Sequence, residues 1–380
     1  MLFYPYFRFF FENHKKFAGS PKSVVQNFIT YFIVHAIQPF HSPLSNQTMR
    51  FKLLNSAALL ALLFVTSCLD HRLPTGPAQI QTQDVATNLA APLGLAFDDK
   101  GQLWITEVAA GKVSVMTPDG KVYPAITGFT VAVSPENTPD GLNHLAYKDG
   151  ILYILHGVDE KMYKANVGSF KPGDAPLTVG QLTSEPIGQW VIDFNFPQDT
   201  QDSNIYNLIF GPNGDMYIVD AGQNAIIKRT PAGVLSVFAT FPGIPNPTMI
   251  GPPVSQAVPT GIAFDGQKFL VTTLVGFPFP SGKARIYQVD LAGNVSIYQD
   301  GLTSLVDIIL GADNRPIVLT VAEFGQMGPT PNTGKITSIS GGQPSIWIQG
   351  LNLPTSIVAG APNTFYVNSL MGGTIKKLFY

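Results

Sequence analysis

The chain has 380 residues, of which 36 are Gly and 31 are Pro; 45% are hydrophobic and only 13% are charged. The apolar fraction is too high for a disordered chain, so the Gly and Pro content indicates a packed, turn-rich protein. The net charge of −2 hides an asymmetry, because residues 1–67 hold six of the 23 basic and one of the 25 acidic residues, which leaves 17 against 24. No basic stripe remains for a nucleic-acid partner.

A signal sequence begins at Met49. Met-Arg-Phe-Lys is followed by an apolar run from Leu53 to Val65 and then by Thr-Ser-Cys68. This is the order of a basic region, an apolar region and small residues before a cleavage point, and the run is too short to span a membrane comfortably. Val-Thr-Ser-Cys resembles a bacterial lipobox, so Cys68, the single cysteine, is predicted to carry the lipids that anchor the chain. The alternative is a plain signal peptide with an incidental cysteine.

The N-terminal segments fix the predicted domain boundaries. A second start at Met49, directly before an intact signal, suggests that residues 1–48 are over-called upstream sequence; the alternative is a real hydrophobic extension. In enteric bacteria, an Asp directly after the lipidated cysteine retains a lipoprotein in the inner membrane. Asp70 is not adjacent to Cys68, so this signal is absent. The predicted location is therefore the outer membrane of a Gram-negative envelope, facing the periplasm or the surface. The predicted segments are 1–48 upstream, 49–67 signal peptide, 68–82 lipidated cysteine and tether, and 83–380 folded domain.

Six copies of one pattern then follow along the chain. Each has an alternating strand, a turn rich in Gly, Asp or Asn, a second strand, a loop and a third strand. The copies begin near Leu93, Asn143, Asn207, Thr260, Val306 and Thr355. A repeat of about 50 residues matches four-stranded blades, so the prediction is an all-β, six-bladed β-propeller of the NHL/TolB-like type with antiparallel blades. A strand near Asp84–Asn88 should complete the last blade, and residues 168–206 are expected to be a long insertion before blade three.

The repeats also align the polar positions of each blade. In a propeller the first strands surround the axis, and the loops after the second strands open on one face, where polar groups can converge into a site. The predicted axial positions are Gly94, His144, Asn207, Gly261, Asp307 and Ser356. The ends of the second strands are Glu107, His156, Asp220, Thr273, Thr320 and Asn368.

Four stretches are more specific than the repeats: Asp202–Tyr206, Val219–Ile226, Val258–Thr260 and Leu274–Tyr287. Together they resemble the ScyD/ScyE family, NHL-like propeller proteins named for a gene cluster that makes the indole–phenol pigment scytonemin. The family usually has Pro and Gly around the tyrosine of the first motif, where this chain has Ile205 and Asn207. It usually has Glu before the leucine of the last motif, where this chain has Thr273. The resemblance implies the fold and the envelope location more than an activity.

Two motifs and one acidic residue are candidates for ligand contact. Asp220 and Asn224 flank Ala-Gly, and they either bond the turn backbone or bind a ligand. Phe277 and Phe279 alternate with prolines on a loop expected to be exposed, where they either stack on an aromatic ligand or cap the channel mouth. Asp193, in the expected insertion, is a candidate to face the channel.

His144 and His156 are the only imidazoles of the predicted propeller. With Glu107, Asp193 or Asp220 they are candidates to hold a divalent ion, Ca or Zn, and His144, His156 and Asp220 form the predicted metal set. The alternative is that each histidine is hydrogen-bonded within the channel. The sequence has no nucleophile elbow, His-Glu-x-x-His, phosphate loop or dinucleotide fingerprint.

Three functions remain open at this point. The first is a lipid-anchored, monomeric propeller that binds a small molecule or a protein partner on its axial face, with Asp307 and Asn368 among the channel candidates. The second is a metal-dependent, lactonase- or esterase-like hydrolase that uses the channel. The third, an accessory role in aromatic secondary metabolism, is implied by the family resemblance alone.

Overall fold

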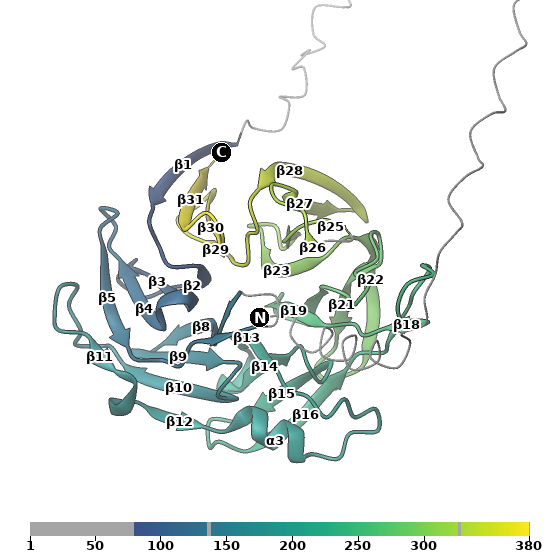
Figure 1. Cartoon of the computed structure of the whole chain (residues 1–380), viewed down its shortest axis with the longest axis horizontal. Coiled ribbons are helices and arrows are strands. Elements are labelled where there is room, and N and C mark those ends of the chain that lie inside the picture. The colour runs from purple at the N-terminus through teal and green to yellow at the C-terminus, as the bar shows by residue number, and fades with distance from the viewer. Residues whose placement is uncertain (1–79, 135–137, 326–327, 380) are drawn as a thin grey trace, which may run out of the picture. The chain divides into compact units, whose positions relative to one another are not determined.

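The computed structural model describes residues 80–134, 138–325 and 328–379. The predicted upstream segment, the signal peptide, Cys68 and nearly all of the tether lie outside the described residues. Six sheets, each with four main strands, are arranged around a common centre, which confirms the predicted six-bladed β-propeller (Figure 1). Within every blade the neighbouring main strands pair antiparallel, as the sequence predicted.

The first three blades follow one another along the chain. Blade one contains β2 (Pro92–Phe97), β3 (Leu103–Glu107), β4 (Lys112–Met116) and β5 (Val122–Thr127). Blade two contains β8 (Leu142–Lys148), β9 (Ile151–His156), β10 (Lys161–Asn166) and β12 (Thr183–Glu185). Blade three contains β13 (Ile205–Phe210), β14 (Met216–Asp220), β15 (Ala225–Arg229) and β16 (Leu235–Thr240).

The last three blades complete the ring. Blade four contains β19 (Pro259–Phe264), β20 (Phe269–Thr273), β21 (Ala284–Val289) and β22 (Val295–Leu302). Blade five contains β23 (Leu305–Leu310), β24 (Pro316–Thr320), β27 (Gly334–Ser340) and β28 (Gln343–Leu351). Blade six contains β29 (Ile357–Ala359), β30 (Thr364–Ser369), β31 (Thr374–Phe379) and β1 (Gln81–Ala86).

Short elements decorate the loops. The two-stranded pairs are β6 (Ala132–Val133) with β7 (Pro139–Asp140), β17 (Ile244–Pro245) with β18 (Val254–Ser255), and β25 (Phe324–Gly325) with β26 (Gly328–Pro329). The helical turns are η1 (Val108–Ala110), η2 (Val179–Gln181) and η3 (Pro212–Gly214), and α3 (Ile187–Asp193) is a short α-helix. None of the helices in the described part is long and apolar enough to cross a membrane.

The ring is closed by the strand that enters it first. β1 pairs antiparallel with β31, with Gln81 opposite Phe379, so the two ends of the described domain form one blade (Figure 1). This confirms the predicted closure, although the strand begins at Gln81, before the predicted start. Pairing β31 in this way hides an edge that would otherwise offer free backbone groups to another chain.

The expected insertion before blade three is corrected by the structure. Residues 183–185 are β12, the fourth strand of blade two, and β11 (Leu177–Thr178) pairs parallel with β5 of blade one. The remainder includes α3, which contacts β10. The sequence did not reveal β12 because a three-residue strand is too short to show an alternating pattern.

The core lies between blades. The second strands β3, β14, β20 and β24 are buried along their whole length, because each has a neighbouring strand on both sides and a neighbouring blade on both faces. Their Val, Ile and Leu side chains belong to four clusters, each of which joins neighbouring blades. The hydrophobic burial that holds the ring together is therefore shared by neighbouring blades.

Candidate functional site

The polar residues at the ends of the second strands bind the segment that leads into their own blade. Glu107 is 1% exposed; its Oε2 accepts a hydrogen bond from the Ala90 amide at 2.7 Å, and its Oε1 accepts one from Ser114 Oγ at 2.5 Å. Lys112 Nζ lies 3.2 Å from Oε1. Both carboxylate oxygens of Glu107 are therefore engaged within blade one.

Asp220 has the same role in blade three. Its Oδ1 accepts from the backbone amides of Asn204 at 3.0 Å and Gln223 at 2.8 Å, and its Oδ2 accepts from Ser203 Oγ at 2.6 Å. Burial raises the pKa of the Asp220 carboxyl, and the hydrogen bonds from Ser203 and the turn amides oppose that rise. Of the two interpretations of Asp220, the geometry supports bonding of the turn backbone.

Asn368 closes blade six onto blade one. Its Oδ1 accepts from the amides of Thr355 and Ser356 at 3.0 and 2.7 Å, and its Nδ2 donates to the carbonyl of Leu93 at 3.0 Å. Thr273 differs, since its hydroxyl exchanges hydrogen bonds with the Arg285 backbone inside its own blade.

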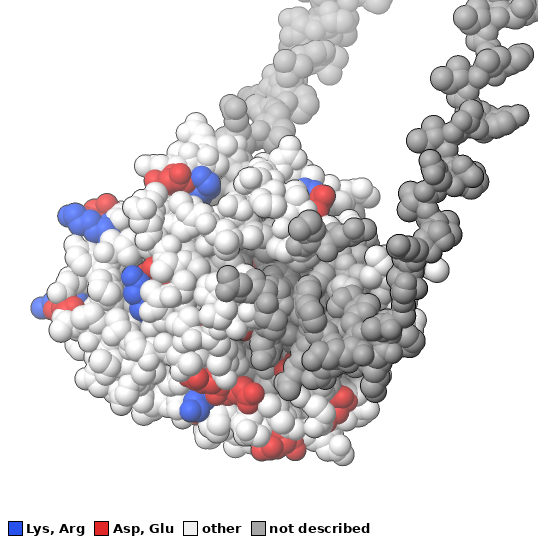
Figure 2. Space-filling view, viewed as in Figure 1, with Lys and Arg blue, Asp and Glu red and all other residues white. Residues whose placement is uncertain are grey.

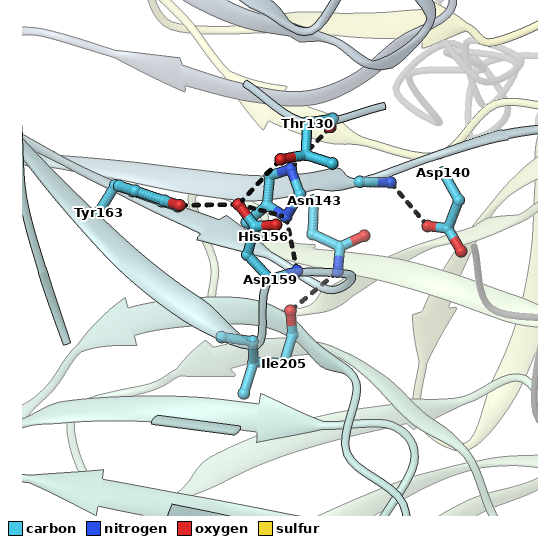
Figure 3. A network of polar contacts seen from close by, with 8 residues as sticks. Thr130, Asp140, Asn143, His156, Asp159, Tyr163 and Ile205 are labelled. Carbon is cyan, nitrogen blue, oxygen red and sulfur yellow. Dashed lines mark hydrogen bonds and ion pairs between the residues drawn. The ribbon is translucent and has the colours of Figure 1, made fainter. Parts of the chain in front are cut away.

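His156 is hydrogen-bonded through both ring nitrogens, in the network shown in Figure 3. The Asp159 amide can only donate, so it fixes Nδ1 as the acceptor at 3.0 Å and leaves Nε2–H to donate to the Thr130 carbonyl at 2.9 Å. Burial lowers the pKa of His156, against the opposing effect of the Asp159 charge, so the ring is neutral. Tyr163 Oη donates to Asp159 Oδ2 at 2.7 Å and completes the network.

The predicted metal set is not assembled. The atoms of His156 and Asp220 that could bind a metal already form hydrogen bonds. Asp193 is exposed at the end of α3, where its Oδ1 accepts from Gln189 Nε2 at 2.9 Å. Figure 1 places α3, whose last residue is Asp193, at the outer part of the ring, away from the expected position in the channel. Among the described residues no group of three or more His, Cys, Asp or Glu side chains is arranged to hold a metal ion.

The predicted axial positions do converge. A Cβ on Gly94 would lie 2.7 Å from the Cα of His144, and a Cβ on Gly261 would lie 2.6 Å from the Cα of Asp307. These two glycines let the neighbouring first strands approach closely. The first strands of blades one and two, and those of blades four and five, are thereby brought together at the axis.

Asp307 is the centre of these axial contacts. Its Oδ1 accepts from Asn207 Nδ2 of blade three at 3.2 Å, and its Oδ2 accepts from Ser356 Oγ at 3.2 Å and the Ile357 amide at 2.9 Å, at the start of blade six. Burial raises the pKa of the Asp307 carboxyl to about 7, although these hydrogen bonds act to lower it. Asp307 thus joins blades three, five and six.

His144 and Tyr206 pack together beside Asp307. Their rings meet edge to face with centroids 4.8 Å apart, and both side chains are buried. Burial lowers the pKa of His144 to about 3, against the effect of the Thr355 backbone, so the imidazole is neutral. Burial, and then the charge of Asp307, raise the pKa of Tyr206. His144 Nε2 and Tyr206 Oη have no hydrogen-bond partner among the described residues.

The Phe-Pro-Phe-Pro segment is not the exposed loop that the sequence predicted. Phe279 is 6% exposed and stacks on Phe324 with ring centroids 4.3 Å apart. Phe277 is half-buried, and Ser255 Oγ donates to its carbonyl at 3.0 Å. Phe279 belongs to the same apolar cluster as Tyr206, so the segment caps the core rather than presenting aromatic rings to solvent.

A pocket of about 490 Å³ lies among the segment that leads into blade three, the turn between β14 and β15, and the connection from blade three to blade four. Sequence reasoning missed it. We call it the loop-face pocket. It is lined by Phe196, Pro197, Gln198, Asp199, Thr200, Gln223, Asn224, Thr240, Phe241, Pro242, Gly243, Val254, Ser255 and Gln256. Of these only Asn224 was predicted as a ligand candidate, because the pocket is built by loops that are remote in sequence and carry no repeating pattern.

Charged side chains are sparse on the face shown in Figure 2. They form small groups of mixed sign, most of them toward the periphery. The described domain has several ion pairs within or between neighbouring strands, such as Lys376 with Asp84 at 2.6 Å. Surface pairs of this kind are screened by solvent and contribute little to stability.

Solved structures similar to this chain share its fold. A gluconolactonase from Xanthomonas campestris is 12% identical over 79% of this chain and 89% of its own, with a TM-score of 0.52. A PQQ-bound aldose sugar dehydrogenase from Streptomyces coelicolor is 14% identical over 80% and 99%, also at 0.52. A putative gluconolactonase is 12% identical over 80% of this chain and 93% of its own, at 0.51. No protein-family model and no curated protein sequence matches the chain. The chain is a six-bladed β-propeller protein, and at these identities the likeness extends to the fold alone.

Proposed function

We propose that this protein is a lipid-anchored propeller of the bacterial envelope that binds a small molecule in the loop-face pocket. The observation that carries the proposal is the pocket itself, whose volume of about 490 Å³ lies within the range of small-molecule sites. Gln223 and Asn224 are buried residues of its lining, and we call them its floor. They belong to Val219–Ile226, one of the motifs that resemble the ScyD/ScyE family. The rest of the wall comes from loops of blade three and from the connection to blade four.

The contacts at the propeller axis favour the loop-face pocket over the central channel as the binding site. Asp307, Asn207 and Ser356 bond one another there, and the rings of His144 and Tyr206 pack against each other. Glu107, His156, Asp220 and Asn368 likewise hold backbone groups within the ring. The pocket, in contrast, is bordered by exposed residues such as Asp199 and Val254, which leave an entrance from solvent.

Ligand binding in the pocket can be tested by a substitution that fills the pocket with a larger side chain. Val254 lines the pocket and is 52% exposed, so Val254→Trp adds bulk at the entrance without disturbing the core. Val234→Trp is the matched control, since Val234 is 63% exposed and does not line the pocket. In saturation-transfer NMR with a library of small molecules, binders of the native protein should lose their signal with Val254→Trp and keep it with Val234→Trp. Binding that both variants retain would refute this site.

The envelope address rests on the sequence around Cys68, together with the domain that begins at β1 shortly after it. Cysteine acylation supplies several chains, enough for stable attachment. In a Gram-negative host, the full chain should fractionate with membranes and the Cys68→Ala variant should appear in the soluble periplasmic fraction. Intact-mass measurement of the membrane form should find a chain that starts at Cys68 and carries acyl groups; a chain that retains residues 1–67 would contradict the proposal.

A further inference from the structure

We infer that the loop-face pocket selects an uncharged ligand that presents hydrogen-bond acceptors beside an apolar face. This inference rests on the proposed function, because it assigns a ligand class to the same pocket. Three features of the pocket support it: the charge of its walls, the hydrogen-bonding capacity that its amide side chains retain, and its apolar surface.

The walls of the pocket offer no counter-charge for an anion. Asp199 is the only ionisable side chain among the described residues that line it. The chain has no charged residue between Arg229 and Asp265, the stretch that supplies the Thr240–Gly243 and Val254–Gln256 walls. An anion would enter a partly desolvated site without a cation and close to Asp199, and such burial is unfavourable.

A cationic ligand would gain little electrostatic energy in the pocket. Asp199 is exposed, and its carboxylate already accepts from the Gln201 backbone amide at 2.9 Å and from the Gln201 side chain. A carboxylate that remains in water interacts weakly with an opposite charge. The electrostatics of the pocket therefore favour a molecule without net charge.

The amides on the floor have fixed orientations. The backbone amides of Val258 and Thr200 can only donate, so the atoms they reach, Asn224 Oδ1 at 2.8 Å and Gln223 Oε1 at 3.1 Å, must be oxygens. Thr200 Oγ1 also donates to Gln223 Oε1, at 2.6 Å, so this oxygen has both lone pairs occupied. The two amide groups accordingly present their nitrogens for further bonding.

Each amide nitrogen keeps one N–H that these bonds do not use. Gln223 Nε2 donates once, to the Gln198 carbonyl at 3.0 Å, and Asn224 Nδ2 donates once, to Gln256 Oε1 at 3.0 Å. A primary amide has two N–H groups, so one remains on each. The hydrogen-bonding capacity left on the floor is therefore mainly that of a donor, and it suits a carbonyl, ether or hydroxyl oxygen of the ligand.

Part of the remaining surface is apolar. Pro197, Pro242, Phe241 and Val254 contribute hydrocarbon walls next to the amides. Phe241 is held in place by packing on Tyr287, with ring centroids 5.2 Å apart, so this wall is preformed. A rigid apolar wall beside a few fixed polar groups is the usual composition of a selective small-molecule site.

The test uses compounds that share a ring system and differ in charge. Naphthalene-2-carboxamide, naphthalene-2-carboxylate and naphthalen-2-ylmethylammonium, with matched sets built on smaller rings and on cyclic sugars, are titrated against the full chain in detergent by calorimetry or ligand-observed NMR. We expect an uncharged member to bind, its carboxylate counterpart to bind at least about tenfold more weakly, and its ammonium counterpart to bind no more tightly. A carboxylate or ammonium member that binds more tightly than its uncharged counterpart would overturn the ligand class, while pocket binding would stand. If no compound of any charge binds, the proposed function fails as well.

A matched pair of variants tests the donor role of Asn224. Asn224→Asp keeps the oxygen that accepts from Val258 and removes the N–H donors, at a residue with φ of +59°. Asn314→Asp makes the same change at an exposed turn with φ of +60°, away from the pocket. The uncharged compound should lose about tenfold or more in affinity with Asn224→Asp and none with Asn314→Asp, and circular dichroism should show that both variants are folded at the temperature of the titration. Equal affinity for native protein and Asn224→Asp would overturn the assignment of the donor.

Discussion

At Gly261 the first strand of blade four lies against the backbone of blade five. A Cβ there would come within 2.6 Å of Asp307 Cα and 2.7 Å of the Ile308 nitrogen, so the backbone itself would have to move. We predict that Gly261→Ala destabilises the protein by about 1–3 kcal/mol, the range for overpacking a tight core. Gly180→Ala is the control, because nothing lies within 4 Å of a Cβ at that position. Chemical denaturation that finds equal stability for the two variants would contradict the close approach of these strands at the axis.

Asp307 should make stability depend on pH. Its pKa is raised by burial to about 7 in the folded protein, from the ordinary value of 3.8, so the folded state takes up a proton between these values. A group with a raised folded pKa stabilises the fold below its unfolded pKa, and this contribution is lost as the pH rises to about 7. The neighbouring His144, whose pKa is lowered to about 3, stays neutral throughout that window.

The measurement compares the native protein with Asp307→Asn at several pH values. Asn cannot titrate, so any cost of the substitution itself is the same at every pH. The free energy of unfolding of the variant relative to that of the native protein should therefore rise by a few kcal/mol from pH 4 to pH 7. The expected size follows from about 1.4 kcal/mol per unit of pKa shift. Asp220, whose pKa is also raised, is present in both proteins and cancels. A constant difference across the range would mean that Asp307 titrates near its ordinary value.

At the scale of elements, β1 carries the closure of the ring. It pairs with β31 over residues 81–86, and its Asp84 also forms an exposed ion pair with Lys376. Deleting Gln81–Ala86 should lower the unfolding temperature strongly and promote association, because β31 becomes an open edge. Asp84→Asn removes only the ion pair and should cost less than about 1 kcal/mol. A deletion no more harmful than Asp84→Asn would show that the strand pairing does not hold the ring.

Some of these elements could be predicted from the sequence and others could not. The blades were predictable because each repeats an alternating strand, a turn and a second strand, and the axial set from Gly94 to Ser356 followed from the alignment of those repeats. The strand β12 and the pocket were not predictable, because a three-residue strand has no period and the pocket joins loops without a common pattern. Glu107, His156, Asp220 and Asn368 were correctly placed at the strand ends, but the sequence could not show that backbone groups of the ring occupy them.

For the molecule as a whole, stability should depend on having all six blades. Blade six is bonded to both neighbours: Asn368 reaches the Leu93 carbonyl of blade one, and Ser356 reaches Asp307 of blade five. A chain that ends before Thr355 would lose these bonds and expose the flanks of blades one and five, each rich in buried apolar side chains. We predict that this truncation yields no soluble, cooperatively folding protein.

A circular permutant tests whether folding requires the closed ring of six blades or the native order of the blades along the chain. Because Gln81 pairs with Phe379, the two ends of the domain are adjacent, and a short linker can join them without strain. New termini can be opened at the exposed turn between β19 and β20, at Gly266, where no other atoms lie within 4 Å of the position a Cβ would take. This permutant keeps every blade and every axial contact, so it should fold and unfold cooperatively, measured by circular dichroism and size-exclusion chromatography, whereas the truncated chain should not. A stable, soluble five-blade chain would show that the blades are nearly independent units. The bonds that Asp307 and Asn368 make between blades would then not be required for folding.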